Sequence, residues 1–319
     1  MKIRASRRST AVAAAATLAS TGSAYVGART FLSGQAEQAR RVIPKAWDTP
    51  PRADGVYTPG GGPVERWHRG VPFDLHLMVF GDSTATGYGA RNAEEVPGVM
   101  IARSLAEVSG RRIRLSTKAI VGATSKGLSG QIDAMFVAGP PPDGAVIMIG
   151  ANDITKLHGI GPSARRLGAA VRRLRASGAV VVVGTCPDFG VITAIPQPLR
   201  TVARTRGLRL ARAQAAAVRT SGGLPVPLAD LMTTNFRRAP ELMFSSDMFH
   251  PSGAGYALAA NQLLPALCNA LGGFAATEEP ESPLETRTDV NTLLSRLGGM
   301  SRLWRRSTGV PAPIVVPAS

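Results

Sequence analysis

The chain is predicted to be an α/β protein, with a doubly wound parallel sheet of five strands and helices on both faces. Two observations lead to this prediction. Between residues 74 and 271, short apolar segments alternate with longer segments whose apolar residues recur at helical spacing. Residues 179–184 (Ala-Val-Val-Val-Val-Gly) are apolar without interruption, as in a strand that helices cover on both faces. Alternation of this kind favours parallel βαβ units.

The expected elements alternate along the chain. A strand is expected wherever a short apolar run lies between turn residues, at 75–80, 112–118, 145–149, 179–184 and 224–228. A helix is expected in the longer segment after each strand, at 97–109, 124–137, 162–176, 198–220 and 252–271. In helix 162–176 the arginine pairs 165/166 and 172/173 are expected to face solvent. Residues 74–275 are therefore the expected main domain.

The two ends of the chain differ in composition from this domain. Residues 1–28 begin with basic residues and continue with twenty uncharged ones, the pattern of a signal peptide or an uncleaved N-terminal anchor; a disordered basic leader is the alternative. Residues 29–73 are rich in Pro and Gly and are expected to form a linker or strap. Residues 276–319 are expected to hold a short amphipathic helix and a disordered end. That helix either docks on the domain or lies on a membrane surface.

The charge of the chain narrows the range of partners. There are 37 Lys and Arg residues against 21 Asp and Glu, giving a net charge of +16. This excess indicates either a solvated basic surface or contact with an anionic membrane or cell-wall polymer. Nucleic acid is not expected as a partner, because no nucleic-acid-binding motif is present and the N-terminus favours export. We expect an exported monomer, secreted or associated with the cell envelope.

The two cysteines, Cys186 and Cys268, are expected to be small buried thiols. Cys186 should follow a strand, and Cys268 should lie far along a helix that starts at the same sheet edge, roughly 24 Å away. A disulfide needs Cα atoms within about 7 Å, so none is expected. No cluster of His, Cys and carboxylate residues has metal-ligand spacing, so neither a metal nor another cofactor is expected.

Residues with catalytic potential follow the first three expected strands. Gly81-Asp82-Ser83 closes strand 75–80 and places the Ser83 hydroxyl on a tight strand-to-helix turn beside backbone N–H groups, where Ser83 is expected to be exposed at the sheet edge. Gly122 and Asn152 follow the next two strands, and the carboxyl ends of parallel strands meet at one sheet edge. Ser83 and Gly122 supply N–H groups and Asn152 a side-chain amide, the donors that stabilise an oxyanion. These three residues are the candidate oxyanion hole.

A serine nucleophile also needs a base, and the chain has four histidines. His250 opens the last helix, with Asp247 three residues before it. At this spacing a carboxylate reaches the imidazole nitrogen that is turned away from the serine. Ser83, His250 and Asp247 are therefore the candidate catalytic residues. A structural role is expected for the other histidines, His68, His76 and His158.

These residues resemble the sequence blocks of the SGNH hydrolases, also called GDSL-type esterases. The matching blocks are Gly81-Asp82-Ser83, Gly122-Ala123-Thr124-Ser125, Gly150-Ala151-Asn152-Asp153 and Asp247-Met248-Phe249-His250-Pro251. The resemblance covers roughly residues 74–271 and implies a flavodoxin-like sheet of order 2-1-3-4-5 and metal-free hydrolysis of acyl esters. Two positions depart from the family pattern, because Thr84 stands in place of Leu and Thr117 in place of Asn.

A serine esterase acting on small or short-chain acyl esters is therefore the expected function. The alternatives are an acyltransferase or a carbohydrate O-deacetylase with the same triad. A non-catalytic binding module has no need of all five site residues and is disfavoured.

Other residues near these blocks have expected supporting roles. Asp82 should brace the nucleophile turn, and Asp153 should fix the Asn152 loop. Asp188 should stabilise a turn, and the alternative is that it lines the pocket. Four apolar residues flank the Asp247–His250 pair and are expected either to line an acyl pocket or to belong to the core, with neither location favoured: Met243, Phe244, Met248 and Phe249.

Overall fold

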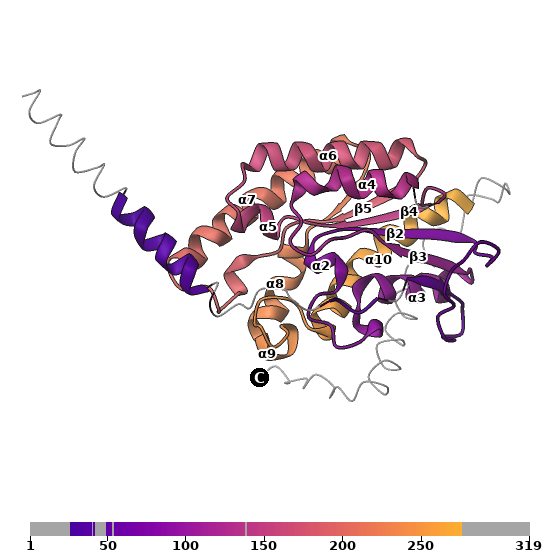
Figure 1. Ribbon diagram of the computed structural model, residues 1–319, viewed down its shortest axis with the longest axis horizontal. Helices are drawn as coiled ribbons and strands as arrows, with labels where there is room; N and C mark the ends of the chain where they lie inside the picture. Colours follow the sequence, from indigo (N-terminus) through magenta and orange to yellow (C-terminus); the bar gives the residue numbers. More distant parts are fainter. Residues whose placement is uncertain (1–25, 40, 42–48, 53, 138, 276–319) are drawn as a thin grey trace, which may run out of the picture. The chain divides into compact units, whose positions relative to one another are not determined.

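The computed structural model describes residues 26–39, 41, 49–52, 54–137 and 139–275 (Figure 1). A six-stranded sheet in the order β1-β3-β2-β4-β5-β6 lies at its centre. The strands are β1 (Gly55–Tyr57), β2 (Leu75–Gly81), β3 (Ile113–Thr117), β4 (Gly144–Met148), β5 (Val180–Gly184) and β6 (Leu224–Val226). The five strands β2 to β6 are parallel, and their order β3-β2-β4-β5-β6 is the order 2-1-3-4-5 that the resemblance implies.

The sixth strand corrects the prediction for residues 29–73, which are more than a linker or strap. They contribute β1, which pairs antiparallel with β3 at the sheet edge. Asp54, just before β1, accepts the backbone N–H of Thr117 at 3.0 Å, and both Val56 and Tyr57 are buried. A three-residue strand is too short to show a periodic pattern, which explains why the sequence does not predict it.

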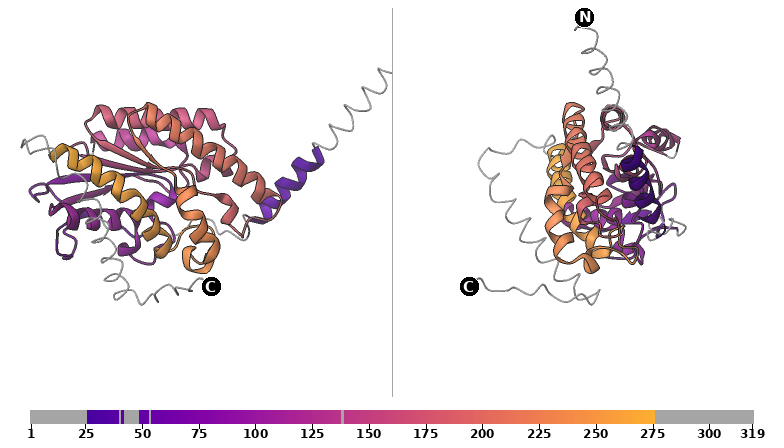
Figure 2. Two further views of the ribbon diagram at one scale, coloured as in Figure 1. Left: turned by 180° about the vertical axis from the view of Figure 1, so that it is seen from behind. Right: turned by 90° about the vertical axis from the view of Figure 1, so that its left-hand side faces the viewer.

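Helices cover both faces of the sheet (Figures 1 and 2). On one face, the core is formed by buried residues of the strands and of three helices: α4 (Leu128–Val137), α6 (Ile160–Ala176) and α7 (Leu199–Thr220). On the other face lie α3 (Pro97–Ser109) and α10 (Gly253–Ala275). There Gly98 of α3 lies close to Val79, and Gly144 of β4 lies close to Leu267 of α10. The predicted doubly wound α/β fold is confirmed.

Short helices occur between the predicted elements. They are α2 (Ser83–Thr86), α5 (Ala151–Thr155), α8 (Leu228–Arg238) and α9 (Pro240–Met243), with the 3₁₀ turns η1 (Ala93–Glu95), η2 (Ser125–Gly127) and η3 (Phe189–Val191). α8 shortens the strand that is expected at 224–228. β6 ends at Val226 because Pro227 has no N–H to donate to the sheet. From Leu228 the apolar residues instead follow a helical spacing, with Met232 and Phe236 buried.

No disulfide joins the two cysteines, as predicted, but only one of them is fully buried. Cys186 and Cys268 are both free. Cys186 is fully buried after β5, and burial raises the pKa of its thiol. Cys268 on α10 is only half-buried, although its burial still raises the pKa of its thiol to about 11. At neutral pH both are therefore neutral thiols, which are poor nucleophiles.

Residues 26–39 are helical, so a helix crosses the boundary expected between residues 28 and 29. The side chain of Gln35 connects this helix to the start of α7, because it accepts the N–H of Leu199 at 3.0 Å and donates to the carbonyl of Gln197. The rest of the expected signal peptide, residues 1–25, and the expected C-terminal extension, residues 276–319, lie outside the described residues. Among the described helices, none is both long and apolar enough to cross a membrane.

Candidate active site

The turn after β2 places Ser83. Gly81 ends β2 with φ +137°, and a Cβ there would collide with the carbonyl oxygen of Met148 on β4. Only glycine fits this close contact between neighbouring strands. The side chain of Gln131 on α4 holds the same residue, since it donates to the Gly81 carbonyl and accepts the Gly81 N–H, both at 2.8 Å. The turn that carries Ser83 is therefore fixed on two sides.

Asp82 braces this turn, as the sequence predicts. Its carboxylate caps α2 by accepting the N–H of Thr84 at 3.0 Å, and it accepts the N–H of Gly150, in the loop after β4, at 3.3 Å. Burial raises the pKa of Asp82 to about 6, although the hydrogen bonds from Thr84 and Gly150 oppose the shift. Asp82 thus joins the loop of Ser83 to the loop of Asn152.

Ser83 is the first residue of α2 and is only 5% exposed. The sequence predicts a more exposed serine at the sheet edge, but His250 and the walls of a pocket cover it. The Ser83 hydroxyl lies 3.0 Å from His250 Nε2. The nucleophile candidate and the base candidate, 167 residues apart in the chain, are therefore in hydrogen-bond contact.

Asp247 orients His250 and is itself held by three donors. Its Oδ2 lies 2.6 Å from His250 Nδ1. Its Oδ1 accepts the N–H groups of Phe249 and His250 and the hydroxyl of Ser245, all within 2.9 Å. Burial alone would raise the pKa of Asp247, but the hydrogen bonds from His250 and Phe249 outweigh it and lower the pKa to about 2.

The ionised carboxylate decides which nitrogen of His250 carries the proton. A carboxylate accepts hydrogen bonds only, so Nδ1 must donate to Asp247. In the neutral ring Nε2 is then free to accept the proton of the Ser83 hydroxyl. This is the tautomer that a general base needs.

Aromatic rings hold the imidazole in place. The ring of Tyr88 lies 4.5 Å from that of His250, and the ring of Phe249 lies 5.0 Å away, both measured between centroids. Tyr88 is fixed in turn, because the buried hydroxyl of Tyr256 on α10 donates to its carbonyl at 2.6 Å. The sequence gives no signal for Tyr88, Tyr256 or Ser245, because none belongs to a motif and two of the contacts span more than 160 residues.

Gly122 and Asn152 flank Ser83 because of the strand order. β3 and β4 are the two neighbours of β2, so the loops after them lie on either side of the loop that carries Ser83. Gly122 has φ +78°, which a glycine adopts without strain. A Cβ at this position would meet no protein atom within 4 Å, so within the fold itself it is the left-handed backbone that favours glycine.

Two side chains tie the loops of Gly122 and Asn152 together. Lys156, at the end of α5, donates to the Gly122 carbonyl at 2.9 Å. Asp153 is 1% exposed and accepts the N–H of Ser125 at 2.9 Å and its hydroxyl at 2.7 Å. Asp153 also accepts the hydroxyl of Ser163 at 2.8 Å. The expected role of Asp153 in fixing the Asn152 loop agrees with these contacts.

The remaining titratable candidates lie away from the Ser83–His250 contact. Asp188 caps η3 through the N–H of Gly190 and pairs with Arg204 on α7 at 3.1 Å, so its carboxylate stabilises a turn. His76 donates to or accepts from Ser116 at 2.9 Å inside the sheet. His158 contacts Asp153 at 3.2 Å.

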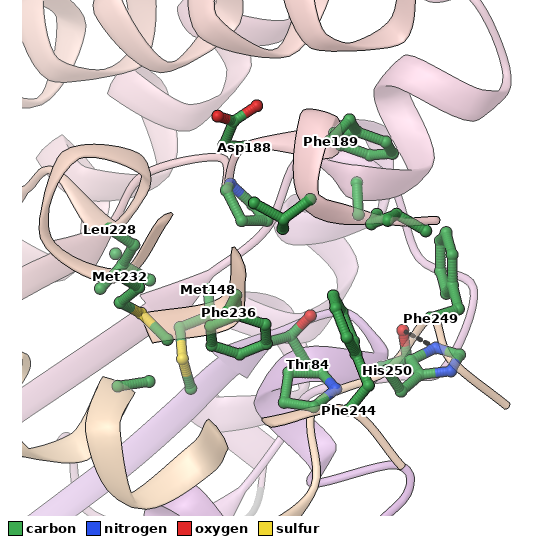
Figure 3. Close-up of a pocket in the computed structure, with 18 of the residues that line it drawn as sticks. Thr84, Met148, Asp188, Phe189, Leu228, Met232, Phe236, Phe244, Phe249 and His250 are labelled. Carbon is green, nitrogen blue, oxygen red and sulfur yellow. Dashed lines mark hydrogen bonds between the residues drawn. The ribbon is translucent and has the colours of Figure 1, made fainter. Parts of the chain in front are cut away.

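An apolar pocket opens beside Ser83 and His250 (Figure 3). Its volume is about 80 Å³. Leu228 and Met232 of α8 lie at the end away from His250, and Phe244 lies close to it. Of the four residues assigned equally to pocket or core, Phe244 and Phe249 line the pocket, whereas Met243 and Met248 are absent from its lining. Thr84 and Asp188 also line it, so Asp188 combines its turn role with a place in the pocket wall.

The described residues contain no group of three or more His, Cys, Asp and Glu side chains that could hold a metal ion. What the site does contain is a buried serine, an imidazole held by an ionised carboxylate, and an apolar pocket beside them. Such an arrangement suits transfer of an acyl group from an ester to the serine.

Comparisons with known proteins point to the same class of reaction, the hydrolysis of esters. Residues 79–258 match the GDSL-like lipase/acylhydrolase family. The GDSL-like esterase Rv1075c of Mycobacterium tuberculosis is 70% identical over 279 residues, which cover 87% of this chain and 87% of the relative.

A solved structure shares the fold. LAE5, an alpha/beta hydrolase enzyme from the metagenome of Lake Arreo, Spain, superimposes with a TM-score of 0.50 at 20% identity, covering 61% of this chain and 95% of LAE5. The family match spans more than half of the chain, and the mycobacterial relative matches most of it. The chain therefore belongs to the GDSL-like lipase/acylhydrolase family of the SGNH hydrolase superfamily, and it is a carboxylic ester hydrolase.

Proposed function

We propose that the protein hydrolyses small or short-chain acyl esters through a covalent acyl-serine intermediate. Ser83 is the nucleophile, His250 the general base and Asp247 the residue that orients His250. The observation that supports this proposal best is the unbroken hydrogen-bonded series from Asp247 through His250 to Ser83, which ends beside the apolar pocket.

In the first step, Ser83 Oγ attacks the ester carbonyl carbon while His250 Nε2 takes the hydroxyl proton. The imidazolium that forms is stabilised by the Asp247 carboxylate. The carbonyl oxygen becomes an oxyanion, which the N–H groups of Ser83 and Gly122 and the side-chain amide of Asn152 would stabilise. Collapse of this intermediate expels the alcohol, which receives the proton from His250.

In the second step, water replaces the alcohol. His250 takes a proton from the water, whose oxygen attacks the acyl carbon, and a second oxyanion forms in the same place. Its collapse returns the proton to Ser83 Oγ and releases the carboxylic acid. Neither step changes an oxidation state, and both use only groups of this chain and water.

The pocket supports a preference for short acyl chains. At about 80 Å³ it is smaller than the cavities of about 150 Å³ that hold a benzene ring in other proteins. Its apolar wall favours a hydrocarbon chain over a charged one. Acetyl to butyryl groups are therefore the substrates that fit best, and longer chains must displace side chains at the far end of the pocket.

A chain-length series of aryl esters tests this preference. We expect kcat/KM to be highest for acetyl to butyryl esters and to fall for octanoyl esters. Met232→Ala removes a side chain at the far end of the pocket and should raise the octanoyl-to-acetyl ratio of kcat/KM about tenfold, because each buried methylene contributes to discrimination.

Leu231→Ala is the matched control, since Leu231 is also on α8 but is 42% exposed and does not line the pocket. It should leave the ratio unchanged. A wild-type preference for long chains, or equal effects of the two variants, would contradict the assignment of this pocket to the acyl group.

Asn152→Ala tests the oxyanion hole. The amide of Asn152 should bind the oxyanion more strongly than it binds the substrate carbonyl. Its removal should therefore raise the activation free energy by roughly 2.7–4 kcal/mol, which lowers kcat with little change in KM. Steady-state kinetics on an aryl acetate measure this split. Thr155→Ala, on the exposed side of the same helix α5, is the control that should stay near wild type. A variant altered in KM alone would make Asn152 a residue that positions substrate.

A further inference from the structure

Arginines are concentrated on two neighbouring helices of one sheet face. α6 contains five arginines and α7 contains six, and neither helix contains Asp or Glu. Two of these arginines form ion pairs, Arg173 with Asp133 and Arg204 with Asp188. Within the described residues the other nine have no carboxylate partner. Most of this charge is therefore not neutralised by the fold.

Five of the arginines without a carboxylate partner are exposed on the side of these helices that is turned away from the sheet, and one of them, Arg172, donates to the hydroxyl of Ser221 at 3.0 Å. Their positions are opposite to those of the buried residues on each helix, such as Leu167 and Leu174 of α6 and Leu210 and Val218 of α7. We call this set the α6–α7 arginine face: Arg165, Arg172, Arg209, Arg212 and Arg219. Figure 1 shows α6 and α7 in the layer of helices that covers one side of the sheet.

The chemistry of this face suits phosphate groups. The planar guanidinium of arginine matches the oxygen pairs of a phosphate better than an ammonium does. Neither helix contains an aromatic residue. Single-stranded nucleic acid is usually bound by stacking on aromatic rings, so this face lacks what such a partner requires.

Exposed apolar residues occur on the helix whose Gln35 contacts the start of α7, and they point to a lipid surface. In the helix of residues 26–39, Val26 is 61% exposed and Phe31 is 58% exposed. Phe31 lies one turn before Gln35, whose hydrogen bonds attach this helix to the start of α7. Segments that combine arginines with exposed apolar residues bind at the interface of anionic membranes, where the charges meet headgroups and the apolar residues enter the acyl boundary.

We propose that the α6–α7 arginine face, together with the exposed apolar residues of helix 26–39, binds membranes that contain anionic phospholipids. This surface is formed by residues other than the proposed catalytic ones. The proposal therefore stands or fails separately from the serine mechanism.

Vesicle sedimentation with the full chain tests the proposal. We expect the protein to bind vesicles of phosphatidylcholine with about one-third phosphatidylglycerol more tightly than vesicles of phosphatidylcholine alone, and this difference to disappear in high salt. Replacing all five arginines of the face with Gln should weaken binding to the anionic vesicles at least about tenfold, because each arginine near the surface contributes.

The matched control removes the same charge elsewhere. This second variant replaces with Gln five other arginines that are exposed and have no ion pair in the described part of the chain: Arg52, Arg66, Arg69, Arg237 and Arg238. It should retain most of the binding, and both variants should hydrolyse a soluble aryl acetate at the wild-type rate, which shows that they are folded. Phe31→Ser should also weaken binding to the anionic vesicles.

Three results would overturn the proposal. Equal loss in the two five-residue variants would mean that net charge alone drives binding. Unchanged binding in the face variant would place the membrane contact elsewhere. Binding of soluble polyphosphate through the same five arginines, without binding to vesicles, would assign the face to a cell-wall type polyanion instead.

Discussion

Ser83→Ala is expected to lower ester hydrolysis by several powers of ten, on the order of the losses measured when one triad member is removed from other serine hydrolases. The fold should be unchanged, because the substitution removes a single hydroxyl whose partner is His250 Nε2. Steady-state kinetics on an aryl acetate measure the loss, and circular dichroism measures the fold. A fluorophosphonate should label wild type at Ser83 and should not label the variant.

Thr84→Ala is the control for this prediction. Thr84 is the next residue of the chain and lines the same pocket, and its backbone N–H, which the substitution keeps, caps α2 by donating to Asp82. The Thr84 variant should keep both labelling and activity within about tenfold of wild type. A fully active Ser83→Ala variant, or a label on another residue, would remove Ser83 as the nucleophile.

The sheet and the site blocks could be predicted because their signals are local. Residues 179–184 form a continuous apolar run, and Gly81-Asp82-Ser83 directly follows another, so strand, turn and nucleophile candidate are read within a few residues. Strand order then places Gly122 and Asn152 on either side of Ser83. Asp247 and His250 are close in the chain, which makes their pairing readable as well.

The features that the sequence does not predict depend on contacts between distant segments. β1 has three residues and is held by its pairing with β3 and by Asp54. The packing of Tyr88 against His250 joins segments that no motif connects. Ser83 is buried rather than exposed because other elements close over the sheet edge, which no local pattern records.

The same reasoning separates the three buried aspartates near the site. Asp82, Asp153 and Asp188 all follow strands, and each is a plausible acid by sequence position alone. The hydrogen bonds of each aspartate show a structural role instead. Asp82 joins the loop of Ser83 to the loop of Asn152. Asp153 holds Ser125 and Ser163, and Asp188 holds η3 and Arg204, whereas Asp247 contacts the imidazole.

Asp247→Asn is therefore expected to lower kcat sharply, by about ten-thousandfold. Asp247 Oδ1 accepts three hydrogen bonds, from Ser245, Phe249 and His250. Only the oxygen of an asparagine can keep them, so its NH₂ group must face His250 Nδ1. Nδ1 then has to accept, and the ring proton moves to Nε2, where it blocks transfer from Ser83. The loss should not exceed that of His250→Ala.

The pH dependence of activity distinguishes a wrong tautomer of His250 from the loss of the Asp247 charge alone. In wild type the pKa of Asp247 is lowered to about 2, so the carboxylate is already ionised well below neutral pH and keeps its charge through the neutral and alkaline range. In Asp247→Asn the neutral ring holds its proton on Nε2, and raising the pH should not restore activity. Recovery at high pH would contradict the tautomer argument.

Comparison of three Asp→Asn variants in one assay decides which aspartate orients His250. Asp188→Asn should stay within about tenfold of wild type, because it loses a turn contact and an ion pair with an exposed arginine. Asp153→Asn should fall between the two, since it loosens the loops of Gly122 and Asn152 but leaves His250 Nδ1 paired. If Asp153→Asn or Asp188→Asn were the most damaging while Asp247→Asn stayed near wild type, the contact of 2.6 Å between Asp247 and His250 would not be the one that orients the base.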